Sequence, residues 1–420
     1  MNALAPLRYI PFRCLIAGRT VNALGNAFAP IALAFAVLDL TGSATDLGLV
    51  VGTRMLVNVL FLLFGGVLAD RLPKHLLMVG SSLAAAATQG VVATLVLTHT
   101  ATIPLLIGLA ALNGMVGALA MPASAAILPQ TVPADVRQQA NALNRLSLNG
   151  AALLGAPLAG VVVAAAGPGV GIAVDGVAFA ISALCFAPLR AVALPAAEAT
   201  SRSNVLLDLR TGWSEFRSRT WLWVVVAGFC VLNAAWTGAM VVLGPLVADA
   251  TIGRRGWGFV LAAETAGMIV GALIALRLRI RRLLFFGVCC CVPFGLPVLF
   301  LGIYPHLWVL VLAALVAGLT IEQFGVAWET TMQEHVPADK LARVYSYDMV
   351  GSFIAIPVGE MLVGPISGAA GVETTLIGAF LLTTLASLAM LSSRAVRTLR
   401  HELPEPGPQL VAKPVGESTA

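Results

Sequence analysis

Several ionisable side chains lie inside long apolar runs of this sequence, where an unpaired charge is costly. They are Arg19, Arg54, Asp175, Glu264, Glu322, Asp348 and Glu360. Such a group can bind a charged ligand, carry a proton, or pair with another charge across a gate. In the first run, Arg19, Asn22 and Asn26 recur at helical spacing. We expect this polar stripe to face a central cavity.

Arg54 and Glu264 lie at corresponding depths, near the outer ends of the second and eighth apolar runs. We expect them to meet across the central axis. Two roles compete: an ion pair that closes an outer gate, or binding of a cation or proton by Glu264. A purely structural pair is a third alternative. Glu322, nearer the inner end of its run, is the second candidate for proton coupling.

The remaining polar candidates have two interpretations each. Asp175 and Glu360 could equally well bond polar groups of a neighbouring helix or transfer protons. Asn233 and Trp236 share one face of the seventh run and are candidates for substrate contact. A Trp at that depth is also a common packing residue.

The elements that position these residues are membrane helices. Hydrophobic residues make up 59% of the 420 residues and charged residues 11%, whereas soluble proteins average about 25% charged residues. A membrane helix needs about 20 apolar residues. Twelve such runs begin near Cys14, Leu47, Leu76, Ile103, Leu143, Val170, Leu222, Trp257, Leu284, Leu307, Ser346 and Thr374. None alternates like a membrane strand, so the sequence predicts an all-α polytopic membrane protein with twelve transmembrane helices.

Basic residues set the expected orientation. Nearly all of the 25 Lys and Arg residues fall on the side of the N-terminus, and only Arg254 and Arg255 fall in loops on the other side. The positive-inside rule then places both termini on the cytoplasmic side of the membrane, which we expect to be a bacterial inner membrane. The net charge of +5 therefore reports topology and not nucleic-acid binding.

The two halves of the chain resemble each other. Residues Ile127–Gly167 align without a gap on Thr331–Gly371, and Gly48 aligns on Gly258, which equates Arg54 with Glu264. Duplicated halves around a central site are typical of secondary transporters. We expect two pseudo-symmetric six-helix bundles, 1–189 and 222–393. Residues 190–221 form a cytoplasmic linker with an amphipathic helix on the membrane surface, or else a solvated linker, and 394–420 form a disordered tail.

The connection after the second run carries a recognisable motif. It reads Gly66-Val-Leu-Ala-Asp70-Arg71, followed by Lys74, and it resembles the signature between spans 2 and 3 of the major facilitator superfamily. The resemblance implies alternating access, with this motif holding a cytoplasmic gate shut. Asp70 would face the start of the eleventh helix near Asp348, and Arg71 and Lys74 would reach carboxylates there. The sequence departs from the signature at Pro73 and His75.

The fifth run carries a second, weaker resemblance. Gly150, Gly155, Pro157 and Gly160 resemble the Gly-rich span-5 signature of exporters that exchange substrate for protons. Small residues at this spacing let helices approach closely. Within the superfamily, three stretches resemble the macrolide-efflux and enterobactin-exporter branch: AGRTVNALGNAFAPIALAFAVLDLTGS, MPASAAILPQTVPADVRQQANAL and WETTMQEHVPADKLARVYSYD.

The sequence favours a carrier over an enzyme. Its five histidines lie in loops or at the ends of runs, and it has no phosphate-binding G-x-x-x-x-G-K-[ST] motif. We expect no cofactor and no metal site, and we interpret the six cysteines as small apolar residues. The function hypothesis is a monomeric, proton-coupled exporter of hydrophobic or amphipathic small molecules, drug-like or siderophore-like. The alternative is a membrane sensor or partner-binding protein on the same fold.

Overall fold

The computed structural model describes residues 4–71, 74–133, 136–191, 213–275, 277–278 and 280–400. Within these ranges only the backbone is described at 62–71, 74, 119–126, 129, 138, 142, 190–191, 338–339, 341–343 and 346.

The N-terminal half is a bundle of six helices, each with enough apolar residues to bury against its neighbours in a bilayer. They are α1 (Ile10–Thr41), α2 (Ala44–Arg71), α3 (Lys74–Leu97), α4 (Ile103–Ile127), α5 (Arg137–Ala166) and α6 (Pro168–Phe186). Helix α5 runs on through Pro157 without a break.

The C-terminal half repeats this arrangement with interrupted helices. Its spans are α8 (Thr220–Thr237) continuing through the π-helical turn η5 (Gly238–Leu243) into α9 (Gly244–Ala250), α10 (Gly253–Ala275), α11 (Leu283–Phe294) with α12 (Leu296–Ile303), α13 (Leu307–His335), α14 (Ala338–Phe353) with α15 (Ile356–Ala370), and α16 (Val372–Ser392). Eleven helical segments of the described chain are long and apolar enough to cross a membrane, and Ile103–Ala118 is a shorter twelfth. The predicted twelve-helix fold is therefore confirmed.

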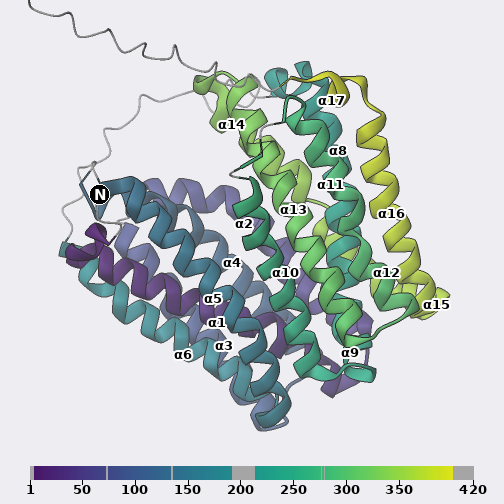
Figure 1. Ribbon diagram of the computed structural model, residues 1–420. Helices are drawn as coiled ribbons and strands as arrows, with labels where there is room; N and C mark the ends of the chain where they lie inside the picture. The colour runs from purple at the N-terminus through teal and green to yellow at the C-terminus, as the bar shows by residue number, and fades with distance from the viewer. Residues whose placement is uncertain are drawn as a thin grey trace, which may run out of the picture.

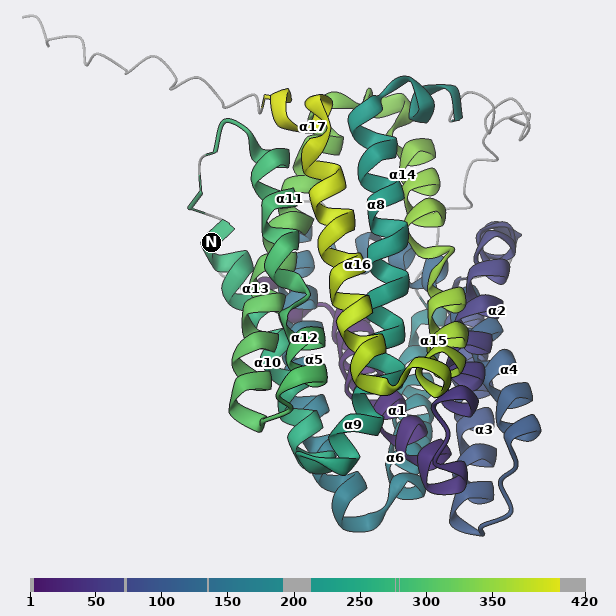
Figure 2. The same cartoon turned by 90° about the vertical axis from the view of Figure 1, so that its right-hand side faces the viewer.

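Among the residues whose side chains are described, a hydrophobic core shared by the two bundles lies towards one end. Figure 1 shows α1, α3, α5 and α6 on the left and α8, α11 and α16 on the right. We call the end where α17 (Arg394–Thr398) lies the terminal end, and the end where α9 lies the closed end; both views place these helices at opposite ends (Figures 1 and 2).

The buried apolar residues show the same asymmetry. At the closed end a single hydrophobic core joins both halves, from Phe35 in α1 to Trp257 in α10. Towards the terminal end there are two separate cores, one around Phe12 and Phe186 in the N-terminal half and one around Trp328 in the C-terminal half. The described buried residues therefore join the halves at the closed end and form a separate core in each half towards the terminal end.

Paired glycines make the contacts across the closed end. A Cβ on Gly258 of α10 would lie 2.6 Å from the carbonyl oxygen of Ala156 in α5, which leaves no room for a side chain. The repeat equates Gly258 with Gly48 of α2 and Ala156 with Glu360 of α15. Gly48 meets the carbonyl oxygen of Glu360 in the same way. The duplication inferred from sequence thus appears as a pseudo-two-fold axis of contacts.

Other repeat positions obey the same symmetry. The equivalent residues Gly167 and Gly371 end α5 and α15 with φ angles of 86° and 87°, in a region that favours glycine. Gly155 lies against the Leu24 carbonyl of α1, and its equivalent Gly359 lies against the Ala234 carbonyl of α8. The glycines of the repeat are therefore close-approach or helix-ending positions.

The linker and the tail differ in part from expectation. Residues 213–218 are helical and dock on α14, where the rings of Trp213 and Phe216 lie 5.6 and 5.9 Å from that of Tyr347. Linker residues 192–212, which include the rest of the expected short amphipathic helix, lie outside the described residues. The expected disordered tail begins at 394, yet Arg394–Thr398 form α17, because Val396 packs into the C-terminal core. Residues 401–420 lie outside the description.

Candidate functional site

A cavity lined by described residues lies inside the N-terminal bundle and has a volume of about 560 Å³. Ligand pockets for drug-sized molecules fall in the range of about 300–1,000 Å³. The described residues that line it all come from α1 to α6, and they supply amides, hydroxyls, two guanidinium groups and aromatic rings. They are Arg19, Asn22, Ala23, Asn26, Arg54, Asn58, Met78, Ser81, Ser82, Ala85, Asn113, Val116, Gly117, Leu148, Phe179 and Phe186.

The polar stripe of α1 lies on the wall of this cavity, whose described lining comes from the N-terminal half and not from both halves of a central cavity. Arg19 donates from Nη1 to the Asn144 side-chain oxygen of α5 at 3.0 Å. One turn further along, the Asn26 amide donates to Oδ1 of Asn22. These side chains therefore find partners on one another and on α5 while they face an open space.

Arg54 lies deeper, where α2 meets α4. Its Nε donates to Oδ1 of Asn113 at 3.1 Å, and the charges of Asp175 and Glu360 act on the guanidinium. Oδ2 of Asp175 accepts a hydrogen bond from Gln89 at 2.6 Å. The other oxygen of Asp175 and Oε2 of Glu360 are buried without a hydrogen-bond partner. Arg54 belongs to the N-terminal half and Glu360 to the C-terminal half, so this charge cluster bridges the two bundles.

The expected pair between Arg54 and Glu264 is not formed. The two residues are symmetry equivalents: the carbonyl of Arg54 packs on Gly114 and that of Glu264 on the equivalent Gly318. Each is thereby fixed against the fourth helix of its own half, and Arg54 turns to Asn113. The half-buried Glu264 side chain has no hydrogen bond or ion pair in the described structure.

The other C-terminal candidates separate into open and packed positions. Glu322 is half-buried and interacts electrostatically with Arg145 of α5. Asn233 donates to the Ser352 carbonyl at 2.9 Å, and the Trp236 ring stacks 3.8 Å from that of Phe294. The last two contacts lie within the C-terminal half, so the structure gives Asn233 and Trp236 packing roles and does not place them on the cavity.

The gate motif is described only as backbone. Gly66, Asp70 and Arg71 lie in the last turns of α2 and Lys74 begins α3, while their side chains lie outside the description. The expected partner Asp348 is described: it accepts from Nε1 of Trp328 at 3.0 Å and from Oγ of Ser352 at 3.2 Å. In this conformation both carboxylate oxygens of Asp348 are bonded within its own half.

The exporter-like glycines of α5 have unequal environments. Gly155 faces α1, and a Cβ on Gly160 would lie 2.8 Å from the Arg254 carbonyl of α10. Pro157 touches α10 as well, because a Cβ on Gly258 would lie 3.3 Å from its Cα. A Cβ on Gly150 would meet no neighbouring helix within 4 Å. Close helix approach therefore explains three of the four positions of the motif.

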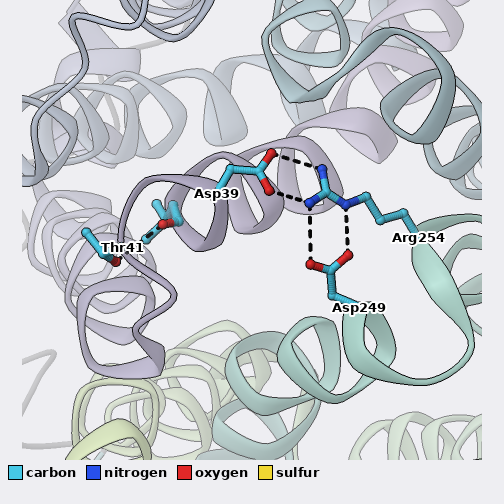
Figure 3. Close-up of polar contacts among 5 residues, drawn as sticks. Asp39, Thr41, Asp249 and Arg254 are labelled. Atoms are coloured by element: carbon cyan, nitrogen blue, oxygen red, sulfur yellow. Dashed lines mark hydrogen bonds and ion pairs between the residues drawn. The ribbon is translucent and has the colours of Figure 1, made fainter.

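A charge cluster closes the end opposite the termini, and sequence reasoning missed it (Figure 3). Arg254 of α10 donates to both oxygens of Asp39 in α1, one of these bonds being 2.9 Å, and from Nε to Oδ1 of Asp249 in α9 at 2.9 Å. Its guanidinium carbon lies 4.7 Å above the ring of Phe35. The signal in the sequence was the rarity of bases on this side, which makes Arg254 the natural partner of nearby acids.

Comparisons with known proteins agree on the family. Residues 15–360 match the model of the Major Facilitator Superfamily. The chain is 24% identical to the multidrug efflux pump Tap of Mycolicibacterium fortuitum, with 89% of this chain and 91% of that protein covered. Tap of Mycobacterium tuberculosis is 25% identical, with 90% and 92% covered.

Solved structures share the fold at low identity. The nucleoside transporter NupG has a TM-score of 0.72 at 12% identity, covering 91% of this chain and 98% of that one. A bacterial homologue of the lysosomal transporter Spinster, solved in an inward-facing and unoccupied conformation, has a TM-score of 0.71 at 13% identity, covering 92% and 96%. This chain therefore belongs to the Major Facilitator Superfamily and is a transporter by family.

Proposed function

We propose that this protein exports hydrophobic or amphipathic small molecules from the cytoplasm by alternating access, as a proton antiporter. The observation that carries the proposal is the packing asymmetry: one core shared by both halves at the closed end, and separate cores towards the terminal end. A polar cavity of drug-like size lies inside the N-terminal bundle. Similarity to multidrug efflux pumps supports drug-like substrates.

In this mechanism the terminal end faces the cytoplasm of a bacterial cell, and the structure corresponds to the inward-open state. Opening outward requires the Arg254–Asp39 contact and the paired glycine contacts to separate. The gate motif with Asp70, Arg71 and Lys74 then closes the terminal end against α14, where Asp348 is held by its own half. The protein acts as a monomer, because each half supplies the other half's gate.

Proton coupling needs a carboxylate whose charge changes the balance between the two states. We propose Glu264, because its side chain has no polar partner in the described structure and is half-buried. Glu322 is the second candidate, since its charge opposes that of Arg145 on the other half. Protonation of Asp175 or Glu360 would also alter the charge balance around Arg54, which places these two third.

Transport by purified protein in liposomes tests the proposal. A cytoplasmic-side load of a drug-like fluorescent dye should leave faster with an imposed proton gradient than without one. Glu264→Gln should abolish that acceleration, and Asp70→Asn should slow transport with little loss of folded protein. Glu373→Gln, which removes an exposed carboxylate at the start of α16, is the control and should behave as wild type.

Two outcomes would contradict the proposal. A transport rate that is the same with and without any ion gradient would exclude antiport. Dye binding without any transport would favour a sensor on the same fold. A normal gradient response in Glu264→Gln would remove Glu264 from coupling and direct attention to Glu322.

A further inference from the structure

The cavity of the N-terminal bundle has a marked charge bias. Its described wall contains two guanidinium groups, Arg19 and Arg54, and no carboxylate. The sequence explains the bias, because residues 1–189 contain five acidic residues and no glutamate. These are Asp39, Asp46, Asp70, Asp135 and Asp175.

The acids of this half whose side chains are described all lie away from Arg19. Asp39 pairs with Arg254 at the closed end, and Asp46 lies in the first turn of α2 at the same end. Asp175 is buried beside Gln89, and its charge acts on Arg54. The charge of Arg54 is thus partly balanced by protein carboxylates.

Arg19 is not balanced in this way. In the described structure its one hydrogen-bond partner is the neutral side chain of Asn144, and no carboxylate pairs with it. A guanidinium has five N–H donors in a planar fork that suits oxyanions such as carboxylate, sulfonate and phosphate. A half-buried cation without a counter-charge is costly, and a bound anion would offset that cost.

The rest of the wall suits the remainder of such a ligand. Side-chain amides of Asn22, Asn26 and Asn58 can donate to or accept from polar groups. The rings of Phe179 and Phe186 provide an apolar face for a hydrophobic body. A cationic drug would instead meet two positive charges in a confined space.

We propose that this cavity is a binding site for amphipathic organic anions, with Arg19 as the group that recognises the oxyanion. The inference rests on the proposed function, since it assigns the substrate class of the same cavity. It separates this protein from an exporter whose substrates are mainly lipophilic cations.

Two dyes with one aromatic frame test the charge directly. Anilinonaphthalene sulfonate carries an oxyanion, and phenylnaphthylamine is the same frame without it. Dye fluorescence is titrated with purified full-length protein in nanodiscs of phosphatidylcholine, and the signal of empty nanodiscs is subtracted. Wild type should bind the sulfonate about tenfold more tightly than the neutral dye, because the anion gains a charge-assisted hydrogen bond.

Variants of one helix assign that preference to Arg19. Arg19→Gln should lose the preference and keep the affinity for the neutral dye, and Arg19→Lys should retain part of it. Arg13→Gln removes an exposed positive charge from the same helix and should bind both dyes as wild type does.

The result that overturns the inference is equal affinity of wild type for the two dyes, which needs no variant to be observed. An equal loss of affinity for both dyes in Arg19→Gln would also overturn it, provided that Arg13→Gln binds both dyes as wild type does. Arg19 would then have a structural role. The titration uses no ion gradient. Protein that prefers the sulfonate yet transports nothing would therefore contradict the proposed function and leave this inference standing.

Discussion

Replacing Asp39 by asparagine removes the negative charge that holds Arg254 across the two halves at the closed end. Asp39 belongs to α1 and Arg254 to α10, whereas the second carboxylate on this guanidinium, Asp249, belongs to the same half as Arg254. Asp39→Asn therefore weakens an interdomain contact and leaves the contact within the C-terminal half in place. The asparagine oxygen can still accept one hydrogen bond, so the change is mainly in charge.

The magnitude follows from exposure and geometry. The side chains of Arg254 and Asp39 are 20% and 41% exposed. Exposed ion pairs contribute about 0–1 kcal/mol, and a two-bond arrangement places this one near the upper limit. A loss of about 1 kcal/mol from the closed end shifts the equilibrium towards its opening by about fivefold. The paired glycine contacts are unchanged, so the closed form remains available.

Cysteine accessibility measures this shift. The native cysteines Cys14, Cys185, Cys230, Cys289, Cys290 and Cys291 are all unpaired and are first replaced by serine or alanine. A single reporter, Ala44→Cys, is then introduced at a position that is 9% exposed beside Gly364 of the other half. Its labelling by a membrane-impermeant maleimide should rise about fivefold in Asp39→Asn.

The matched control is Asp249→Asn, which removes a carboxylate from the same guanidinium but within one half. Its labelling should stay close to that of the parent, since Arg254 keeps both bonds to Asp39. Labelling that is unchanged in Asp39→Asn, or raised equally by both substitutions, would refute the view that this contact holds the halves together.

Two further predictions concern packing and the linker. Gly160→Ala should push α5 away from α10 and destabilise the closed end by about 1–3 kcal/mol. Gly150→Ala on the same helix, where a Cβ meets open space, should be neutral or slightly stabilising. Equal labelling of the reporter cysteine in both variants would contradict this prediction. The hydrogen bond from Lys340 lowers the pKa of Glu215. The stabilisation of the docked segment 213–218 on α14 is therefore complete above about pH 4.3, the ordinary pKa of a Glu side chain. It weakens as the pH falls through the lowered pKa. Glu215→Gln should reproduce that loss at pH 7 and raise the rate of trypsin cleavage within this segment by up to about fivefold; an unchanged rate would show that the aromatic contacts alone hold it.

Local patterns in the sequence predicted much of the fold. Apolar runs of bilayer length predicted the twelve helices, and Arg19, Asn22 and Asn26, which recur at helical spacing, all line the cavity of the N-terminal bundle. The internal repeat predicted which glycines lie at equivalent close contacts, such as Gly48 and Gly258. These features depend on the residues of one helix or on matching positions of two copies, so they can be read without coordinates.

The partners of the buried charges could not be read in the same way. Symmetry suggested that Arg54 meets Glu264, but in the structure Arg54 donates a hydrogen bond to Asn113, and the carboxylates whose charges act on it are Asp175 and Glu360. The reason is geometric: two positions related by a pseudo-two-fold axis can point away from it, and side-chain direction depends on which neighbouring helix offers space. Asn233 and Trp236 share a helix, yet their contacts lie within their own half.

The sequence by itself determined the helices and the duplicated architecture, because each follows from hydrophobicity and repetition along the chain, and its loop charge predicts their sidedness. Only the tertiary structure decided which end is closed, that Asp39 and Arg254 close it, and that the cavity wall is positively charged. Those properties depend on distances between residues far apart in the chain. In the proposed mechanism the protein also adopts at least two arrangements of the same residues, whose free energies differ by a few kcal/mol, so no local pattern can single out the one observed.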